Sequence, residues 1–181
     1  MISYKRLQIL KRLRDLNIPE QDFMLVGIRS KEDKPNVFDD VIYIITPDIC
    51  TPVVATTNPG SDWLLDFMNP KGTAVLKPDM QYLYKLGEHK GYEALVQALP
   101  VTVYRDTNKD LKSDETGKEE TGWFAINIHR ANKWAISKYI GKWSAGCQVV
   151  ADPKDFEFLL QKCKQSKRTT FPYILLREFT V

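Results

Sequence analysis

Apolar residues follow two different periods along this chain, and the period changes near Pro19. Before that proline, one tyrosine and three leucines recur at helical spacing, namely Tyr4, Leu7, Leu10 and Leu13. Ser3 is the expected N-cap, and basic residues occupy the other faces. We therefore expect residues 1–20 to form a helical segment that packs on the rest of the protein through this apolar stripe.

After Pro19 the chain changes to short runs rich in β-branched and aromatic residues, separated by turn residues. These runs predict strands at residues 22–30, 37–46, 50–57, 72–76, 80–87, 100–106, 122–131, 147–152 and 171–180. The sequence NPGSD, residues 58–62, predicts a turn. The runs at 72–76 and 80–87 are separated by KPD, so we expect them to pair with each other.

One further helix interrupts the strands near the C-terminus. Asp152 is the expected N-cap, and Pro153 suits the first helical position because that position needs no backbone N–H donor. Its apolar face is expected to comprise Phe156, Leu159, Leu160 and Cys163. The whole pattern predicts a mostly β protein, sandwich- or barrel-like, with about two helices, in which residues 21–181 form a single domain.

Composition excludes several classes of protein. Hydrophobic residues make up 43% of the chain, as in globular proteins, and a net charge of +3 gives no electrostatic argument for a nucleic-acid partner. Three widely spaced cysteines match neither a disulfide framework nor a zinc site. No window is long and apolar enough for a transmembrane segment, and no signal peptide is recognisable, so we expect a chain that is cytoplasmic as made.

A polar loop contains a weak candidate for a metal site. Its carboxylate and amide residues have part of the spacing of a calcium-binding loop: Asp106, Asn108, Asp110 and Asp114. Leu111 stands where such a loop needs glycine, and Gly117 stands where it needs a bidentate glutamate. The main expectation is therefore a solvated connection with no metal, and the alternative is a calcium-dependent adhesion module.

Residues 126–150 contain one of two histidines and one of three cysteines. Alternation along the preceding run places His129 and Asn127 opposite the more apolar face of a predicted strand, which favours a groove over a core. Cys147 follows a turn of small residues, where its amide and that of Gly146 are free to bind an oxyanion. A thiol beside an imidazole is the usual arrangement for cysteine catalysis, although the residues alone also allow a structural pair.

A longer pattern resembles a known family. His129, fourteen further residues and then Ser144-Ala145-Gly146-Cys147 are similar to the catalytic signature of the L,D-transpeptidases of the YkuD type. The sequence VVATTNPG, residues 53–60, resembles the strand and turn that precede this signature in the family. The resemblance covers roughly residues 37–151, and its specific part is the segment from the histidine to the cysteine.

This resemblance implies acyl transfer on peptidoglycan stem peptides without a cofactor. Cys147 would be the nucleophile, His129 its base, and a carbonyl at Ser144 would orient the imidazole. The amides of Gly146 and Cys147 would form the oxyanion hole. An amine acceptor would give transpeptidation, and water would give carboxypeptidase or endopeptidase hydrolysis. A wall enzyme made in the cytoplasm needs an exit route, which phage lysis enzymes have, so a phage-type murein hydrolase is one variant.

Three positions depart from the family pattern. Ala145 stands where the family commonly has histidine, and Gln148 and Val149 replace an aliphatic residue and the following Arg or Asn. Arg130 and Arg105 are candidates for the missing cation. The departures leave a second hypothesis open, a non-catalytic cell-wall binding or structural module that retains the fold.

Other residues near the signature are candidates for substrate contacts. These candidates are Asn127, Arg130, Trp143, Ala145, Tyr82 and His89. Trp143 either lines an acceptor groove or packs under the turn before Ser144. His89 is either a second base or substrate contact, or a solvated loop residue between Glu88 and Lys90.

Overall fold

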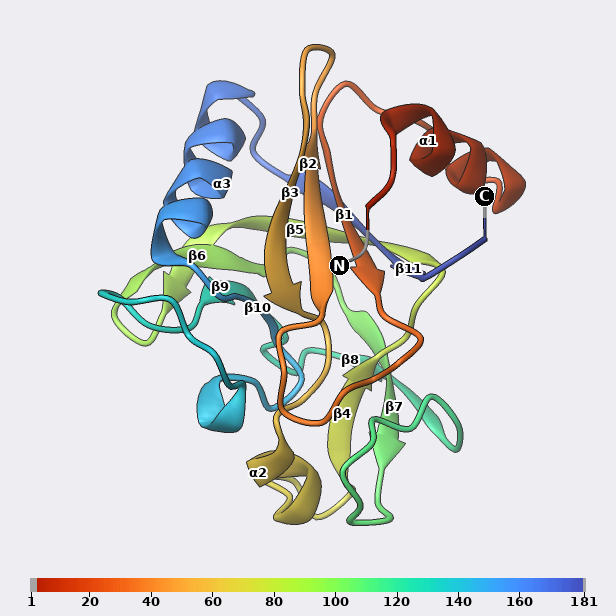
Figure 1. The fold of residues 1–181 in the computed structure, drawn as a ribbon, viewed down its shortest axis with the longest axis vertical. Helices are drawn as coiled ribbons and strands as arrows, with labels where there is room; N and C mark the ends of the chain where they lie inside the picture. The colour runs from red at the N-terminus through yellow and green to blue at the C-terminus, as the bar shows by residue number, and fades with distance from the viewer. Residues whose placement is uncertain (1–2, 181) are drawn as a thin grey trace.

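The computed structural model describes residues 3–180, which form a mostly β fold built on a closed eight-stranded barrel (Figure 1). In order around the barrel, the strands are β1 (Met24–Arg29), β11 (Phe171–Arg177), β5 (Met80–His89), β6 (Tyr92–Gln97), β9 (Ile128–Arg130), β10 (Gln148–Val150), β3 (Cys50–Thr56) and β2 (Asp40–Ile45). A separate three-stranded sheet contains β4 (Thr73–Leu76), β7 (Val101–Asp106) and β8 (Glu119–Gly122). The predicted fold class is confirmed, with the barrel as its form.

The N-terminal helix covers the outside of the barrel. Helix α1 (Arg6–Asp15) packs on β1, β2 and β11 through Ile9, Leu10 and Leu13. Because the opposite face of these strands lines the barrel core, both faces are buried, and β1 and β2 read as continuous apolar runs. The expected stripe was partly wrong: Leu7 is 75% exposed, and Lys5 rather than Ser3 is the N-cap.

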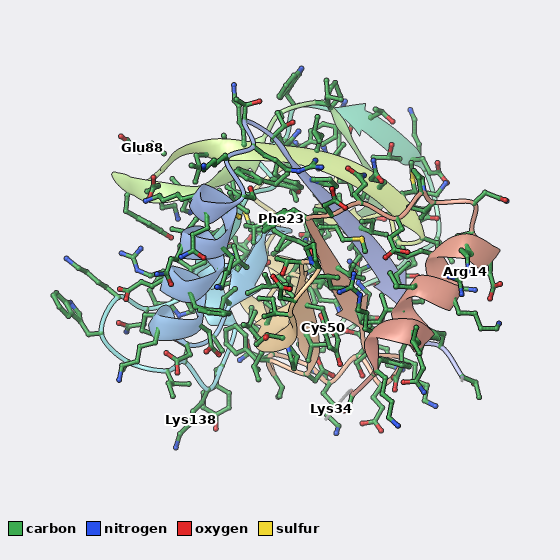
Figure 2. The ribbon with its side chains drawn as sticks, turned by 90° about the horizontal axis from the view of Figure 1, so that it is seen from above. Arg14, Phe23, Lys34, Cys50, Glu88 and Lys138 are labelled. Carbon is green, nitrogen blue, oxygen red and sulfur yellow. The ribbon has the colours of Figure 1, made fainter. Side chains whose placement is uncertain are left out.

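A second helix closes the barrel core on the other side of the molecule. Helix α3 (Pro153–Gln165) begins at Asp152, whose side chain accepts a hydrogen bond from the Lys154 amide, as predicted. The four predicted apolar residues of α3, including Cys163, are buried with the residues inside the barrel, among them Phe23. Viewed from above, α1 and α3 lie on opposite sides of the barrel, with Phe23 between them (Figure 2).

The pairing of the central strands differs from the expectation. β4 does not pair with β5; it pairs with β7, while β5 lies between β11 and β6. Strand β6 was not predicted, because its glutamate and glutamine interrupt the alternation. The predicted turn at 58–62 instead leads into the short helix α2 (Ser61–Leu65), with Gly60 as its N-cap.

The run predicted as one strand at 122–131 is divided in two. β8 ends at Gly122 and β9 begins at Ile128. Between them Ala125 has φ of 55°, a left-handed conformation that interrupts a strand. This break allows the chain to leave the small sheet and enter the barrel, and it positions the segment before His129.

Among the described residues, no helix has the length and apolar character required to cross a membrane.

Candidate functional site

The candidate site lies on two adjacent parallel strands, β9 and β10. Val149 pairs with His129 and Gln148 with Ile128, so the strand containing the histidine and the strand after the cysteine run side by side. On one face of this pair, Ile128 and Val150 belong to the barrel core. On the other face, Cys147 and Val149 pack with Ala131. The sequence prediction that His129 faces away from the core side is therefore confirmed.

His129 is nevertheless buried, with 2% of its surface exposed, and is not in an open groove. Its Nδ1 lies 2.7 Å from the Arg130 carbonyl oxygen, and since a carbonyl only accepts, Nδ1 carries the proton. The Tyr92 hydroxyl donates to the same carbonyl at 3.2 Å and lies 3.2 Å from Nδ1. This arrangement leaves the lone pair on Nε2, a buried atom without a hydrogen-bond partner among residues 3–180.

The second histidine belongs to the same cluster. His89 ends β5 and stacks on His129 with ring centroids 4.0 Å apart. The Asn127 side-chain amide donates to His89 Nδ1 at 3.0 Å, which places the His89 proton on Nε2. His89 is thus neither isolated nor a loop residue, and Asn127 contacts it from the strand face that the sequence predicted.

Tyr92 is a member of this cluster that sequence reasoning did not select. β5 and β6 form a hairpin in which His89 pairs with Tyr92. The two residues between them, Lys90 and Gly91, both have positive φ, as two-residue hairpin turns require. The sequence HKGY contained this signal, because glycine in a two-residue connection predicts that the flanking side chains lie opposite each other.

Both His129 and Cys147 are neutral in this state. Burial lowers the pKa of His129 to about 3, and the nearby His89 contributes further. Burial also raises the pKa of the Cys147 thiol to about 11, although the Asn127 amide and Lys90 act in the opposite sense. The resting site therefore holds a thiol and an imidazole, not an ion pair.

The thiol is held by backbone groups. Cys147 Sγ donates to the Ala125 carbonyl and accepts from the Asn127 amide, both at 3.4 Å. Cys147 is 9% exposed, so the sulfur lies at the edge of the buried cluster. No hydrogen bond joins Sγ to Nε2. For Nε2 to accept the thiol proton, the S–H would have to turn away from the Ala125 carbonyl.

Ser144 has a different role from the one expected. Its carbonyl accepts from the Gly60 amide at 2.8 Å, so the carbonyl that orients His129 is that of Arg130. The Ser144 hydroxyl is buried and donates to the Cys147 carbonyl at 2.8 Å, and it accepts from the Gly146 amide at 3.2 Å. Ser144 thus fixes the turn, and the Gly146 amide of the expected oxyanion hole is already bonded.

The two departures after the cysteine have a structural basis. Gln148 points into the barrel, where its Oε1 accepts from the Tyr173 hydroxyl at 2.7 Å and its Nε2 donates to the Gly146 carbonyl. Val149 is fully buried beside Cys147 and Ala131. Gln148 therefore belongs to the barrel interior, and no cation is placed at position 149.

The remaining candidates fall in different places. The Arg130 guanidinium lies 3.7 Å from the centre of the Tyr92 ring, beside the histidines. Trp143 ends a single 3₁₀ turn (Gly141–Trp143) and is 43% exposed. Ala145 and Arg105 line a cavity beside the cysteine. Tyr82 was wrongly selected: it is buried in the core, and its hydroxyl donates to the Lys77 carbonyl at 2.6 Å.

The polar loop forms a network within itself. Asp106 accepts from the amides of Asn108 and Asp114, while the Asn108 side chain donates to Asp110 and Asp114. Within the described part of the chain, no three His, Cys, Asp or Glu side chains come together as a metal site. The candidate calcium residues therefore act here as internal hydrogen-bond partners.

Comparisons with known proteins do not place the chain in a family. No family model, no curated protein and no solved structure matches it. The functional argument thus depends on the site itself.

Proposed function

We propose that this protein is a cysteine acyltransferase of the L,D-transpeptidase type that acts on peptidoglycan stem peptides. The observation that carries the proposal is an oriented imidazole on the same face of two adjoining strands as a buried thiol. His129 Nδ1 is fixed by the Arg130 carbonyl, its Nε2 is free and buried, and Cys147 lies on the same face of the adjoining strand. A nucleophile, a base and a group that orients the base are the elements of cysteine acyl transfer.

The first half-reaction forms a thioester. Substrate contact turns the thiol toward His129, Nε2 takes the proton, and Sγ attacks the peptide carbonyl. The carbonyl π pair moves to oxygen, and the Cys147 amide is the available donor for this oxyanion, because none of the described residues accepts a hydrogen bond from it. Collapse breaks the C–N bond, and imidazolium gives its proton to the departing amine.

The second half-reaction determines the product. An amine acceptor that attacks the thioester gives a new peptide bond, and water gives a carboxylate; in both cases His129 takes the proton of the attacking group and returns it to Sγ. Neither route consumes a cofactor. The neutral state of the free pair means that substrate binding has to assist proton transfer from the Cys147 thiol to His129.

The test is incubation of the purified protein with defined muropeptides carrying tri-, tetra- and pentapeptide stems, followed by mass analysis of the products. We expect shortened or cross-linked products from the native protein and none from Cys147→Ala or His129→Gln. A transient adduct on Cys147 would identify the thioester. If folded native protein gives no product with any stem, the enzymatic proposal is wrong. Retained muropeptide binding would then support the non-catalytic cell-wall module.

A further inference from the structure

A cavity of about 470 Å³ lies beside the nucleophile. Its walls come from the segment before and at the start of β4, from Arg105 of β7, from residues 123–126 and from Ala145. Ala125 is the residue whose carbonyl accepts the Cys147 thiol, and Ala145 lies two residues before the cysteine. Cys147 itself does not line the cavity, but a ligand there contacts Ala125, whose carbonyl oxygen lies 3.4 Å from the sulfur.

Small side chains form the part of the wall nearest the cysteine. Ala74, Ala125 and Ala145 present backbone and methyl groups there. Gly146 has φ of 122°, and a Cβ at this position would lie 2.5 Å from the Ala74 carbonyl oxygen. The small sheet thus packs against the turn before Cys147, and an extended chain has room to pass the turn without displacing a large side chain.

Arg105 is the cationic residue in this wall. Its side chain is 8% exposed, with the guanidinium carbon 4.7 Å from the centre of the Phe124 ring. Nε donates to Glu120 at 2.7 Å, and Nη1 makes a long 3.4 Å contact with the Gly72 carbonyl. No partner for Nη2 is found among residues 3–180. The guanidinium is held in place while part of its donor edge remains free for a ligand.

Arg105 shares its carboxylate partner with a second cation. Glu120 accepts from both Arg105 and Lys71, the latter at 2.8 Å, so one carboxylate lies between two cations. Two large apolar side chains form an exposed rim, since Met68 and Trp123 are 67% and 63% exposed. An apolar rim beside a buried cation whose only carboxylate partner among the described residues is shared with a lysine matches a peptide segment that contains a carboxylate.

We propose that this cavity binds the acidic segment of the peptide substrate and that Arg105 pairs with its carboxylate. The proposal rests on the proposed function, because it assigns a subsite for a peptide that reaches Cys147. It supplies from the small sheet the cation that Val149 does not supply after the cysteine. Arg105 is accordingly a specificity-determining residue, and Glu120 competes with the substrate for it.

Binding to the Cys147→Ala protein tests the subsite without turnover. The probes are a tetrapeptide-stem muropeptide and the same molecule with its carboxylates converted to amides, titrated calorimetrically. We expect Arg105→Gln to weaken binding of the free acid about tenfold, the cost of losing one charge-assisted hydrogen bond, and to leave binding of the amide nearly unchanged. Arg168→Gln is the matched control, because Arg168 lines a different cavity between the β2–β3 connection and the end of α3.

Glu120→Gln is expected to change the affinity for the free acid in the opposite direction. It removes the competing carboxylate but keeps the guanidinium, so we expect tighter binding of the free acid, by several-fold. A merely structural role for Arg105 predicts no gain from this change. Equal affinity for acid and amide in the unsubstituted protein, or no response to both substitutions, would overturn the subsite.

The outcomes separate this inference from the proposed function. Arg105-dependent binding of the acid without turnover in the native protein supports the subsite and contradicts the acyltransferase. Turnover that is indifferent to Arg105→Gln supports the acyltransferase and contradicts the subsite. Should Arg105→Gln fail to fold, Glu120→Gln still decides the question, because it leaves Arg105 in place.

Discussion

The imidazole of His89 lies against the imidazole of His129, with 4.0 Å between ring centroids and 14° between ring planes. Two stacked imidazoles at this distance oppose each other's protonation, because the second positive charge would lie directly over the first. Burial lowers the pKa of both rings, strongly for His129 and by less for His89. His89 is therefore a positioning residue that also keeps His129 neutral.

Replacing His89 by phenylalanine is expected to shift the acid limb of kcat/KM to higher pH. The substitution retains a flat ring over His129 but removes the neighbouring charge, so the pKa of His129 rises toward its ordinary value. In the proposed mechanism His129 accepts the thiol proton only when neutral, so activity is then lost at a higher pH than in the native protein. The measurement is the pH dependence of muropeptide turnover.

His89→Ala serves as the comparison for that profile. It removes the charge and the stacked ring together. A rate that is lower at all pH values in His89→Ala, but not in His89→Phe, would show that the stacked ring contributes through packing. An unchanged acid limb in the phenylalanine variant would show that His89 does not control the protonation of His129.

His129 is expected to make the fold sensitive to acid. Its folded pKa of about 3 lies below the unfolded value near 6.5, so the unfolded chain binds more protons between these values. The stabilisation from keeping His129 neutral is present above pH 6.5 and falls by about 4 kcal/mol as pH drops to 3. Urea unfolding of native and His129→Gln proteins across this range measures it as a difference that grows in favour of the variant.

The comparison with the His129→Gln variant is needed because Asp40 titrates in the same pH range. Burial raises the pKa of Asp40 to about 6, so its protonation stabilises the fold as pH falls through the same range. The native profile alone therefore mixes two opposing titrations. Subtracting the variant's profile removes the contribution of Asp40, and a difference that is flat from pH 7 to 3 would contradict the depressed pKa of His129.

The hydrogen bond between Gln148 and Tyr173 is expected to stabilise the barrel interior. Removing the hydroxyl with Tyr173→Phe leaves Gln148 Oε1 buried without this donor, which should cost about 1–3 kcal/mol of unfolding free energy. The double variant Tyr173→Phe/Gln148→Leu removes both polar groups and should recover part of that loss, although the bond from Gln148 to the Gly146 carbonyl is also lost. Denaturant melts of the two single variants and the double variant complete the cycle.

The outcome also bears on Gln148, which stands where the L,D-transpeptidase signature has an aliphatic residue. A coupling energy near zero would mean that the two side chains contribute independently. A favourable coupling would show that a polar group on β10 is held by a polar partner on β11, across the barrel, and that the partner residue is part of the departure.

The sequence signals were strongest where local periodicity and tertiary burial coincide. Helix α3 was predicted from its N-cap through its buried face, because Asp152, Pro153 and the apolar repeat all describe one element. The strand pairing could not be predicted from local sequence, since β4 pairs with β7, which is distant in the chain. Which strands pair depends on the closure of the barrel, and no short window of sequence encodes that.

The candidate site likewise has features that local sequence predicts and features that depend on distant strands. His129 and Cys147 were selected by their resemblance to a family signature, and the face of the strand was predicted correctly from alternation. Their burial, the stacked His89 and the orienting carbonyl of Arg130 depend on strands that approach from elsewhere in the chain. Tyr82 was selected because it is close to His89 in sequence, but alternation along β5 turns it into the core.

Two residues of helix α1 allow a direct test of whether the sequence pattern or the observed burial determines stability. Leu7 belongs to the periodic stripe but is 75% exposed, whereas Ile9 lies outside the stripe and is fully buried against the barrel. Truncation of Ile9 to alanine should cost about 2–4 kcal/mol of unfolding free energy, since it removes buried methylenes and leaves a cavity. Leu7→Ala on the same helix should change stability by less than about 0.5 kcal/mol. Equal losses in the two variants, measured by thermal or urea unfolding, would mean that α1 packs through the sequence-predicted face instead.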